Sequence, residues 1–159
     1  MKEAEEEPAE ELRAAAAYVL QGSHACYQCQ ALTPVYAILL VGPFRGKVEE
    51  LVEANDVLLV GPTDLPEKLS EVVTSLSGGS CHPDFSHTAG EEYWMNHCQE
   101  CGAKIGAWDV KEPGAAFFPM TDAEIASLVG TYVEGPFELV DQPLSFSSWT
   151  EEWVRRQSR

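Results

Sequence analysis

The hydrophobic positions of the chain fall into short runs separated by polar, Gly-rich and Pro-rich segments. The run TPVYAILLVG (33–42) is almost wholly apolar and rich in branched side chains, which predicts a well-buried central strand. DVLLV (56–60), EEYWMNHC (91–98) and KIGAWDV (104–110) have a similar character and predict three further strands. In TYVEGPFELV (131–140), two such runs flank a Gly-Pro pair, which predicts a strand, a turn and a second strand.

Helical signals occupy other segments. The stretch LPEKLSEVVTSLSGG places Leu and Val on one face and ends at two glycines, and Asp64, Pro66 and Glu67 suit a helix start with a capping box. An Ala-rich segment follows the N-terminus, and Ala has the highest helix propensity. The expected helices span residues 9–20, 65–77, 121–129 and 148–157. SCHPDFSHTAG and EPGAAFFP are expected to be loops.

Four of the five cysteines form two C-x-x-C pairs, Cys26 with Cys29 and Cys98 with Cys101. Each such turn directs two sulfur atoms to one side, so two turns supply the four ligands of a tetrahedral zinc site. Roughly seventy residues separate the pairs. Loop closure does not forbid this, since each doubling of loop length costs only ~0.6 kcal/mol, whereas structural zinc contributes an apparent ~10–16 kcal/mol in small peptides. We therefore predict one Zn²⁺ per chain, held by these four cysteines.

Two other chemistries use paired cysteines. A thioredoxin-like redox pair lies at a helix N-terminus, and neither pair here is followed by a helical pattern. An iron–sulfur centre is a second alternative. A closed four-cysteine site leaves no position for water or substrate, which marks a structural rather than a catalytic metal. Gly102 follows the second pair and suits the positive φ of such a turn, whereas the first pair has Gln30 there.

Several residues outside the pairs could carry chemistry. His24 and His97 flank the pairs and could replace a cysteine or hydrogen-bond to one, but we interpret them as neighbours of the site. The string GSCHPDFSH holds the residue types that a nucleophilic site or a second metal would need, but without a nucleophile motif around them we interpret it as a polar loop. The members of this second group are Cys81, His82, Asp84 and His87. We therefore predict no catalytic residue and no cofactor-binding residue beyond the metal ligands.

Aromatic residues near the second cysteine pair are expected to be buried. Trp94 and Trp108 lie on the two segments that bracket this pair and are expected to pack around it. Phe117 and Phe118 precede a proline and could form a contact patch, but we expect them in the core.

The strings CYQCQALTPVYAILL, DFSHTAGEEYWMNHCQECGAKIG, EPGAAFFP and VEGPFELV resemble a group of small bacterial zinc-ribbon proteins with rubredoxin-like knuckles. Members of this group combine a C-x-x-C followed by Thr-Pro-Val with a later Tyr-Trp-x-Asn-x-Cys-x-x-Cys-Gly. The similar region runs from about residue 24 to residue 140. The resemblance implies zinc on the same four cysteines, and it implies no reaction, because no activity is assigned to the group.

The charge of the chain narrows the choice of partner. The formal net charge is −16, and −11 of it lies beyond the first eleven residues, which hold six Glu against one Lys. Such a surface repels phosphate backbones and anionic membranes, so we expect neither nucleic acid nor membrane as a partner. No apolar run approaches the ~20 residues of a membrane span, and the acidic N-terminus is unlike a signal peptide, so we expect a cytoplasmic protein.

These patterns predict one α+β domain over residues 9–159, preceded by an acidic flexible tail over residues 1–8. We expect a β-rich zinc-ribbon core with a long inserted strand–helix segment and flanking helices. The expected function is non-enzymatic: a zinc-binding module that contacts another protein. The first alternative is an acidic inhibitor or nucleic-acid mimic on a basic protein site, which a continuous, regularly spaced carboxylate face would favour. A metal- or thiol-dependent enzyme ranks behind it, and would need His82, Asp84 and His87 in one concave pocket.

Overall fold

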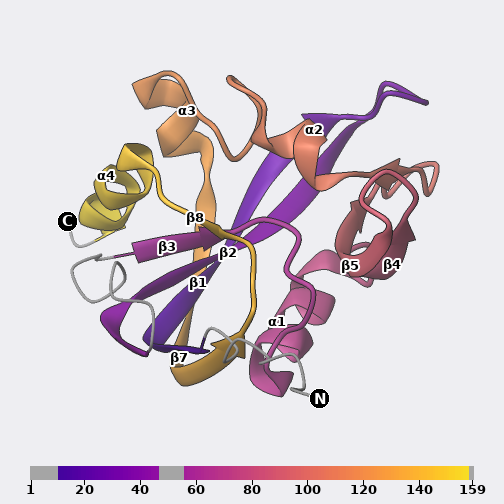
Figure 1. The fold of residues 1–159 in the computed structure, drawn as a ribbon. Helices are drawn as coiled ribbons and strands as arrows, with labels where there is room; N and C mark the ends of the chain where they lie inside the picture. Colours follow the sequence, from indigo (N-terminus) through magenta and orange to yellow (C-terminus); the bar gives the residue numbers. More distant parts are fainter. Residues whose placement is uncertain (1–10, 47–55, 158–159) are drawn as a thin grey trace, which may run out of the picture.

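The computed structural model describes residues 11–46 and 56–157, and within them it confirms a mixed α+β fold. Five antiparallel strands form a larger sheet in the order β7-β1-β2-β3-β8, and three form a smaller sheet in the order β4-β5-β6 (Figure 1). The strands are β1 (Glu11–Ala25), β2 (Leu32–Gly46), β3 (Asp56–Leu59), β4 (His82–Ser86), β5 (Glu91–His97), β6 (Lys104–Ile105), β7 (Val129–Val140) and β8 (Leu144–Ser145). The helices are α1 (Glu67–Ser77), α2 (Ala107–Lys111), α3 (Asp122–Ser127) and α4 (Ser148–Gln157).

The acidic tail predicted over residues 1–8, and the segment 47–55 between β2 and β3, lie outside the described residues. Within the described ranges, none of the helices combines the length and the apolar character that a membrane crossing requires. That residues 9–159 form one domain stays a prediction from the sequence.

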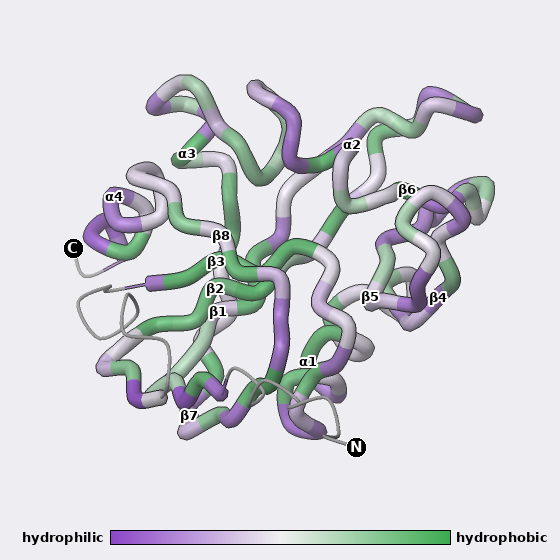
Figure 2. Tube along the Cα trace, viewed as in Figure 1, coloured by the Kyte–Doolittle hydropathy of each residue, from purple (hydrophilic) through white to green (hydrophobic). Residues whose placement is uncertain are grey.

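Strand β2 is buried on both faces, as its apolar sequence predicts. Tyr36, Ile38 and Leu40 belong to one core cluster, which α1 covers with Leu69 and Val73. The alternate residues of β2 belong to a second cluster on the opposite face, with side chains from both cysteine pairs, α2 and α4. Figure 2 shows the resulting hydrophobic band along β1, β2 and β3. Because side chains on a strand alternate between faces, one strand serves both clusters.

Strand β1 overturns the predicted helix over residues 9–20. The Ala-rich segment pairs with β2 on one side and β7 on the other, and Ala14, Ala16 and Ala17 are buried. The helix preference of Ala over other ordinary residues is at most about 0.7 kcal/mol per residue. The backbone hydrogen bonds to two neighbouring strands, together with the burial of the alanine side chains, outweigh that preference. Gly22 lies within β1, where a Cβ would stand only 2.9 Å from the Cβ of Ala116.

A Gly-Pro pair forms a bulge in each strand that neighbours β1, opposite the single residue Ala15. Both ladders of β1 shift register between Ala14 and Ala16. The residues opposite are Gly42-Pro43 in β2 and Gly135-Pro136 in β7, and both peptide bonds are cis. A Cβ on Gly135 would lie 2.4 Å from the carbonyl oxygen of Ala15, so this close approach requires glycine. The predicted strand–turn–strand over 131–140 is therefore wrong: proline sits at a bulge and β7 continues through it.

Helices α1, α3 and α4 confirm three of the four predicted helices, with α1 and α3 shorter than expected. The capping box predicted for α1 is wrong, because this helix begins only at Glu67 and has no side-chain cap bond. Asp64 Oδ1 instead accepts from the N–H of Leu65 at 2.9 Å. Helix α3 does have a side-chain cap, since Thr121 Oγ1 accepts from the N–H of Glu124 at 3.1 Å.

Two segments near the second cysteine pair also differ from prediction. The expected loop SCHPDFSHTAG contains β4, an outer strand of the small sheet that pairs with β5. KIGAWDV forms the short strand β6 and then turns into α2. The turn is stabilised by Asp109, whose Oδ2 accepts from the N–H of Gly106 at 3.2 Å. A capping carboxylate at the third helical position therefore converts a strand-like sequence into a helix start.

Asn96 of β5 joins the two sheets. Its Oδ1 accepts from the N–H of Tyr36 at 2.8 Å, and its Nδ2 donates to the carbonyl oxygen of Tyr36 at 3.1 Å. The ladder between β2 and β3 covers Ile38–Val41, so Tyr36 lies just beyond it. The amide of Asn96 thus supplies the hydrogen bonds that a neighbouring strand would make, and both groups are buried.

Replacing Asn96 by Leu should lower the free energy of unfolding by roughly 2–4 kcal/mol, because it leaves a buried N–H and a buried C=O without partners. Urea denaturation of the metal-loaded protein measures the change. Glu92→Gln on the exposed part of the same strand is the matched control and should stay within ~0.5 kcal/mol of the parent. An Asn96→Leu variant as stable as this control would contradict the bridging role.

Candidate metal centre

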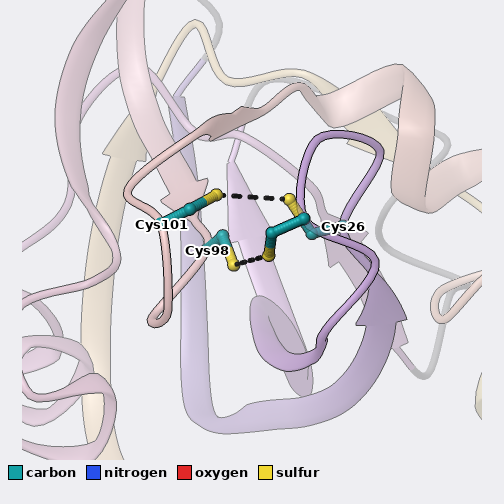
Figure 3. Close-up of side chains that lie close together, drawn as sticks. Cys26, Cys98 and Cys101 are labelled. Atoms are coloured by element: carbon teal, nitrogen blue, oxygen red, sulfur yellow. Dashed lines mark hydrogen bonds between the residues drawn. The ribbon is translucent and has the colours of Figure 1, made fainter.

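The four paired cysteines meet at the tips of two hairpins. Cys26 and Cys29 lie in the turn between β1 and β2, and Cys98 and Cys101 lie in the turn between β5 and β6. The Sγ atoms of Cys26 and Cys101 are 3.6 Å apart, those of Cys29 and Cys98 are 3.5 Å apart, and all four lie within 4.8 Å of one another (Figure 3). A regular tetrahedron with Zn–S bonds of ~2.3 Å has edges of about 3.8 Å. The cluster could therefore bind a metal ion such as zinc.

The two turns are knuckles of the same backbone design. In the first, the Cys26 N–H donates to the carbonyl oxygen of Ala31 at 2.9 Å, and the Gln30 N–H donates to the carbonyl oxygen of Cys26 at 2.8 Å. The second knuckle repeats both bonds at the same lengths. The residue after the second cysteine is left-handed in each case, with φ of 64° at Gln30 and 78° at Gly102. Gln30 thus adopts the conformation that glycine was expected to provide.

Backbone amides stabilise the thiolate form of the first cysteine in each knuckle. The N–H of Cys29, followed by that of Gln28, lowers the pKa of Cys26 to about 6, against the opposing effect of desolvation. The N–H of Cys101 lowers the pKa of Cys98 in the same way. Cys26 and Cys98 are the two buried members of the cluster. The backbone amides therefore stabilise thiolates that water cannot reach.

The second cysteine of each knuckle behaves oppositely. The N–H of Ala31 favours the Cys29 thiolate, but desolvation and hydrogen bonds with the other cysteines outweigh it and raise its pKa to about 12. The pKa of Cys101 is also raised, although the N–H of Ala103 opposes the change. Each short sulfur–sulfur contact therefore joins one cysteine that favours the thiolate to one that favours the thiol. A bound metal ion would take the place of these shared protons, because only thiolates ligate.

The second knuckle is tied to the rest of the fold through Gln99. Its backbone N–H donates to Thr33 Oγ1 at 3.0 Å, and its side-chain Nε2 donates to the carbonyl oxygen of Ser77 at 3.1 Å. Thr33 belongs to β2, four residues after Cys29, and is buried. The knuckles are thus joined by a hydrogen bond beside the sulfur cluster as well as by the cluster itself.

His97 is bonded away from the sulfur cluster. Its Nε2 lies 2.7 Å from Asp84 Oδ2, and its Nδ1 lies 2.9 Å from the carbonyl oxygen of Ser80. Its ring stacks on that of His82, with centroids 4.0 Å apart. The hydrogen bond from His97 is the main cause that lowers the pKa of Asp84 to about 2. Both ring nitrogens of His97 therefore face oxygen acceptors, so His97 holds β4 and the loop after α1 together rather than replacing a cysteine as ligand.

A shallow groove of about 660 Å³ borders the second knuckle. His82 and His97 line it together with Cys98 and the loop that follows α1, whereas Asp84 and His87 are not among its lining residues. The ring of His87 packs edge-on against Phe85 instead, with centroids 5.1 Å apart. The enzyme hypothesis requires His82, Asp84 and His87 to line one concave pocket. Only His82 of these three residues lines this groove.

The remaining candidates, Cys81 and His24, lie apart from the cluster. Cys81 is buried in the core beneath α1, and burial raises its pKa to about 12, which keeps it a thiol at neutral pH. His24 lies near the end of β1, opposite Thr33.

The aromatic predictions are partly wrong. Trp94 packs against the cluster under α1, and Trp108 is 74% exposed on α2, so neither surrounds the second knuckle. Phe117 is buried in the same cluster as Cys26 and Cys98, as expected for the core, whereas Phe118 is exposed.

Asn96 and Thr33, which hold the cysteine hairpins by hydrogen bonds, were not predicted from the sequence. A polar residue inside an otherwise apolar strand, such as Asn96, is the signal that could have indicated them.

Comparison of the chain with protein-family models, with curated proteins and with solved structures found no match. The four-cysteine cluster is consistent with the zinc knuckles that the sequence resemblance implied. Membership of the resembled zinc-ribbon group stays a prediction from the sequence.

Gln30→Gly should raise the free energy of unfolding by about 0.5–1 kcal/mol, because an L-residue in the left-handed region costs roughly 1–2 kcal/mol and glycine does not. Gly102→Ala is the matched reverse change and should destabilise by a similar amount. A Cβ at Gly102 would meet no atom within 4 Å, so this variant reports backbone strain alone. Urea melts at saturating zinc measure both. Gln30→Gly less stable than the parent would contradict the equivalence of the knuckles.

Proposed function

We propose that this protein is a non-catalytic module, stabilised by one zinc ion on Cys26, Cys29, Cys98 and Cys101, that binds another protein. The observation that carries the proposal is the convergence of four sulfur atoms from two hairpin tips. Four thiolates are soft ligands that suit zinc, and they fill its coordination sphere, leaving no position for water or substrate.

The position of the cluster supports a structural role for the metal. Cys26 and Cys98 lie in the core cluster that also contains Phe117 and Trp153. Without a metal, charged sulfur atoms there would face one another at short range, which costs free energy in a buried setting. The metal would also hold the tip of the β1–β2 hairpin to the small sheet.

The surface of the first knuckle supports a protein partner. Tyr27 lies between its two cysteines and is 69% exposed, and Leu32 lies just after the turn and is 72% exposed. Aromatic and aliphatic side chains held on a rigid tip are typical of contact sites between proteins. A metal that fixes the knuckle would fix these two side chains as well.

An acidic inhibitor or nucleic-acid mimic is the second candidate, because the formal net charge of −16 favours a basic site on the partner. The two candidate functions differ in whether nucleic acid competes with this protein for its partner. Nucleic acid should displace a mimic from its partner, but should not displace a module that binds through apolar contacts. A pull-down from the native host, with and without chelator, followed by elution with DNA, separates them.

We expect the purified protein to contain one zinc ion per chain. The Cys101→Ser variant should lose this zinc, whereas the control Cys81→Ala, which removes a cysteine outside the cluster, should retain it. Chelation should lower the melting temperature by more than ~10 °C, since structural zinc is worth ~10 kcal/mol against a stability of ~5–15 kcal/mol. Elemental analysis and thermal melts followed by tryptophan fluorescence, with zinc added back, measure these effects. Full metal content in Cys101→Ser, or equal melting temperatures with and without chelator, would refute the structural zinc. Iron in place of zinc would refute the metal assignment.

Duplex DNA and RNA should not bind at physiological salt, because a chain with ten Lys and Arg against 26 Asp and Glu has few cations to displace counterions. Fluorescence anisotropy with a labelled duplex checks this. The control is a basic DNA-binding domain measured in the same buffer. Tight binding that weakens steeply with added salt would show that the charge argument fails.

A further inference from the structure

A cleft of about 350 Å³ lies beside the exposed ring of Trp108, away from the residues of the metal centre. It is formed where the end of β3, the turn between β4 and β5, and α2 meet. Its lining combines Trp108 and Tyr93 with the charged residues Glu91, Asp109 and Lys111. The volume is at the small end of the ~300–1,000 Å³ range of ligand pockets, which suits one side chain of a partner rather than a large ligand.

The floor of the cleft is rigid. Tyr93 is buried, and its hydroxyl oxygen accepts from the N–H of Ala107 at 3.0 Å. Gly61 is left-handed, with φ of 69°, and a Cβ there would stand 3.0 Å from the Tyr93 ring and 3.1 Å from the Cβ of Ala107. Trp108 thus stands on a packed base, although 74% of its own surface is exposed. Neither local packing nor the metal accounts for so large an exposed ring.

The Trp108 ring already attracts a cation. The Nζ atom of Lys111, one helical turn further along α2, lies 5.3 Å from the ring centroid. This is the distance range of a cation–π interaction. Glu91 and Asp109 add two carboxylates to the lining, in a chain of net charge −16. The chemistry of the cleft therefore complements a positively charged group.

We propose that this cleft binds an arginine side chain of a protein partner, and that Lys111 occupies the ring until that arginine displaces it. A planar guanidinium stacks on an indole and pairs with a carboxylate through two hydrogen bonds, whereas an ammonium is more strongly hydrated. The inference deepens the proposed function by naming the partner's chemistry. It does not depend on the metal, since the cleft shares no residue with the four cysteines.

The first test is a titration of the ¹⁵N-labelled, zinc-loaded protein with the peptide acetyl-Ala-Arg-Ala-amide, followed by NMR. The control peptide contains citrulline, which has nearly the same shape as arginine without its charge. We expect the indole N–H signal of Trp108, assigned by its loss in Trp108→Leu, to shift with arginine and not with citrulline. Equal shifts with both peptides, or no shift with arginine at millimolar concentrations, would overturn the proposal.

Variants separate a built site from general attraction to an acidic protein. Trp108→Leu keeps the net charge and should weaken arginine binding about three- to fivefold, as expected for an exposed cation–π contact. Glu91→Gln should weaken it, and Glu71→Gln on α1, which removes one charge elsewhere, should not. Lys111→Ala should strengthen it, because it removes the competing cation. Equal weakening by both glutamate variants, or unchanged affinity in Trp108→Leu, would overturn the site.

The same variants keep this inference apart from the proposed function. Trp108→Leu should retain one zinc and the parental melting temperature, because its ring is mostly exposed. Loss of arginine binding with full metal content supports the cleft. If metal binding fails in the parent protein while arginine still binds, the structural-zinc proposal falls and the cleft stands.

Discussion

The convergence of four sulfur atoms from two hairpin tips is the constraint on which the rest of the fold depends. Because β2 leaves one knuckle and β5 enters the other, the intervening chain must begin and end at the same point. That segment contributes β3 to the large sheet, and α1 covers one of its faces. Asn96 and Thr33 lie within a few residues of the cysteines and hold the same junction by hydrogen bonds. Cysteine cluster and polar bridges therefore act at one place.

The elements whose conformation is set by their own sequence were predicted correctly. The apolar run 33–42, the one-sided helix ending at Gly78 and the two C-x-x-C turns each carry their own signal, and all three are present. The Ala-rich segment failed because its conformation is set by β2 and β7, two partners that no window around it contains. KIGAWDV failed for a local reason instead: the Asp109 carboxylate accepts from the N–H of Gly106 three residues earlier, which is a helix-start signal inside the segment itself. At the site, the meeting of the four cysteines could be predicted from their spacing, but the bond that directs His97 toward Asp84 comes from a neighbouring strand.

The cysteine hairpins present different residues to the core and to solvent. The buried cysteines and Phe117 face the core, while Tyr27 and Leu32 of the first knuckle face solvent. Trp108 follows β6 by only a few residues and likewise faces solvent. A bound metal ion would keep Tyr27 and Leu32 ordered at the knuckle through its coordination bonds, whereas Trp108 stands on the packed base of Tyr93 and Ala107.

The two bulges opposite Ala15 have a consequence for how the sequence can vary. One residue of β1, Ala15, stands opposite two residues in β2 and two in β7, so the three sites depend on one another. A side chain at position 135 would be excluded by the backbone at position 15. In homologous chains, the pairs Gly42-Pro43 and Gly135-Pro136, more than ninety residues apart, should therefore be gained or lost together.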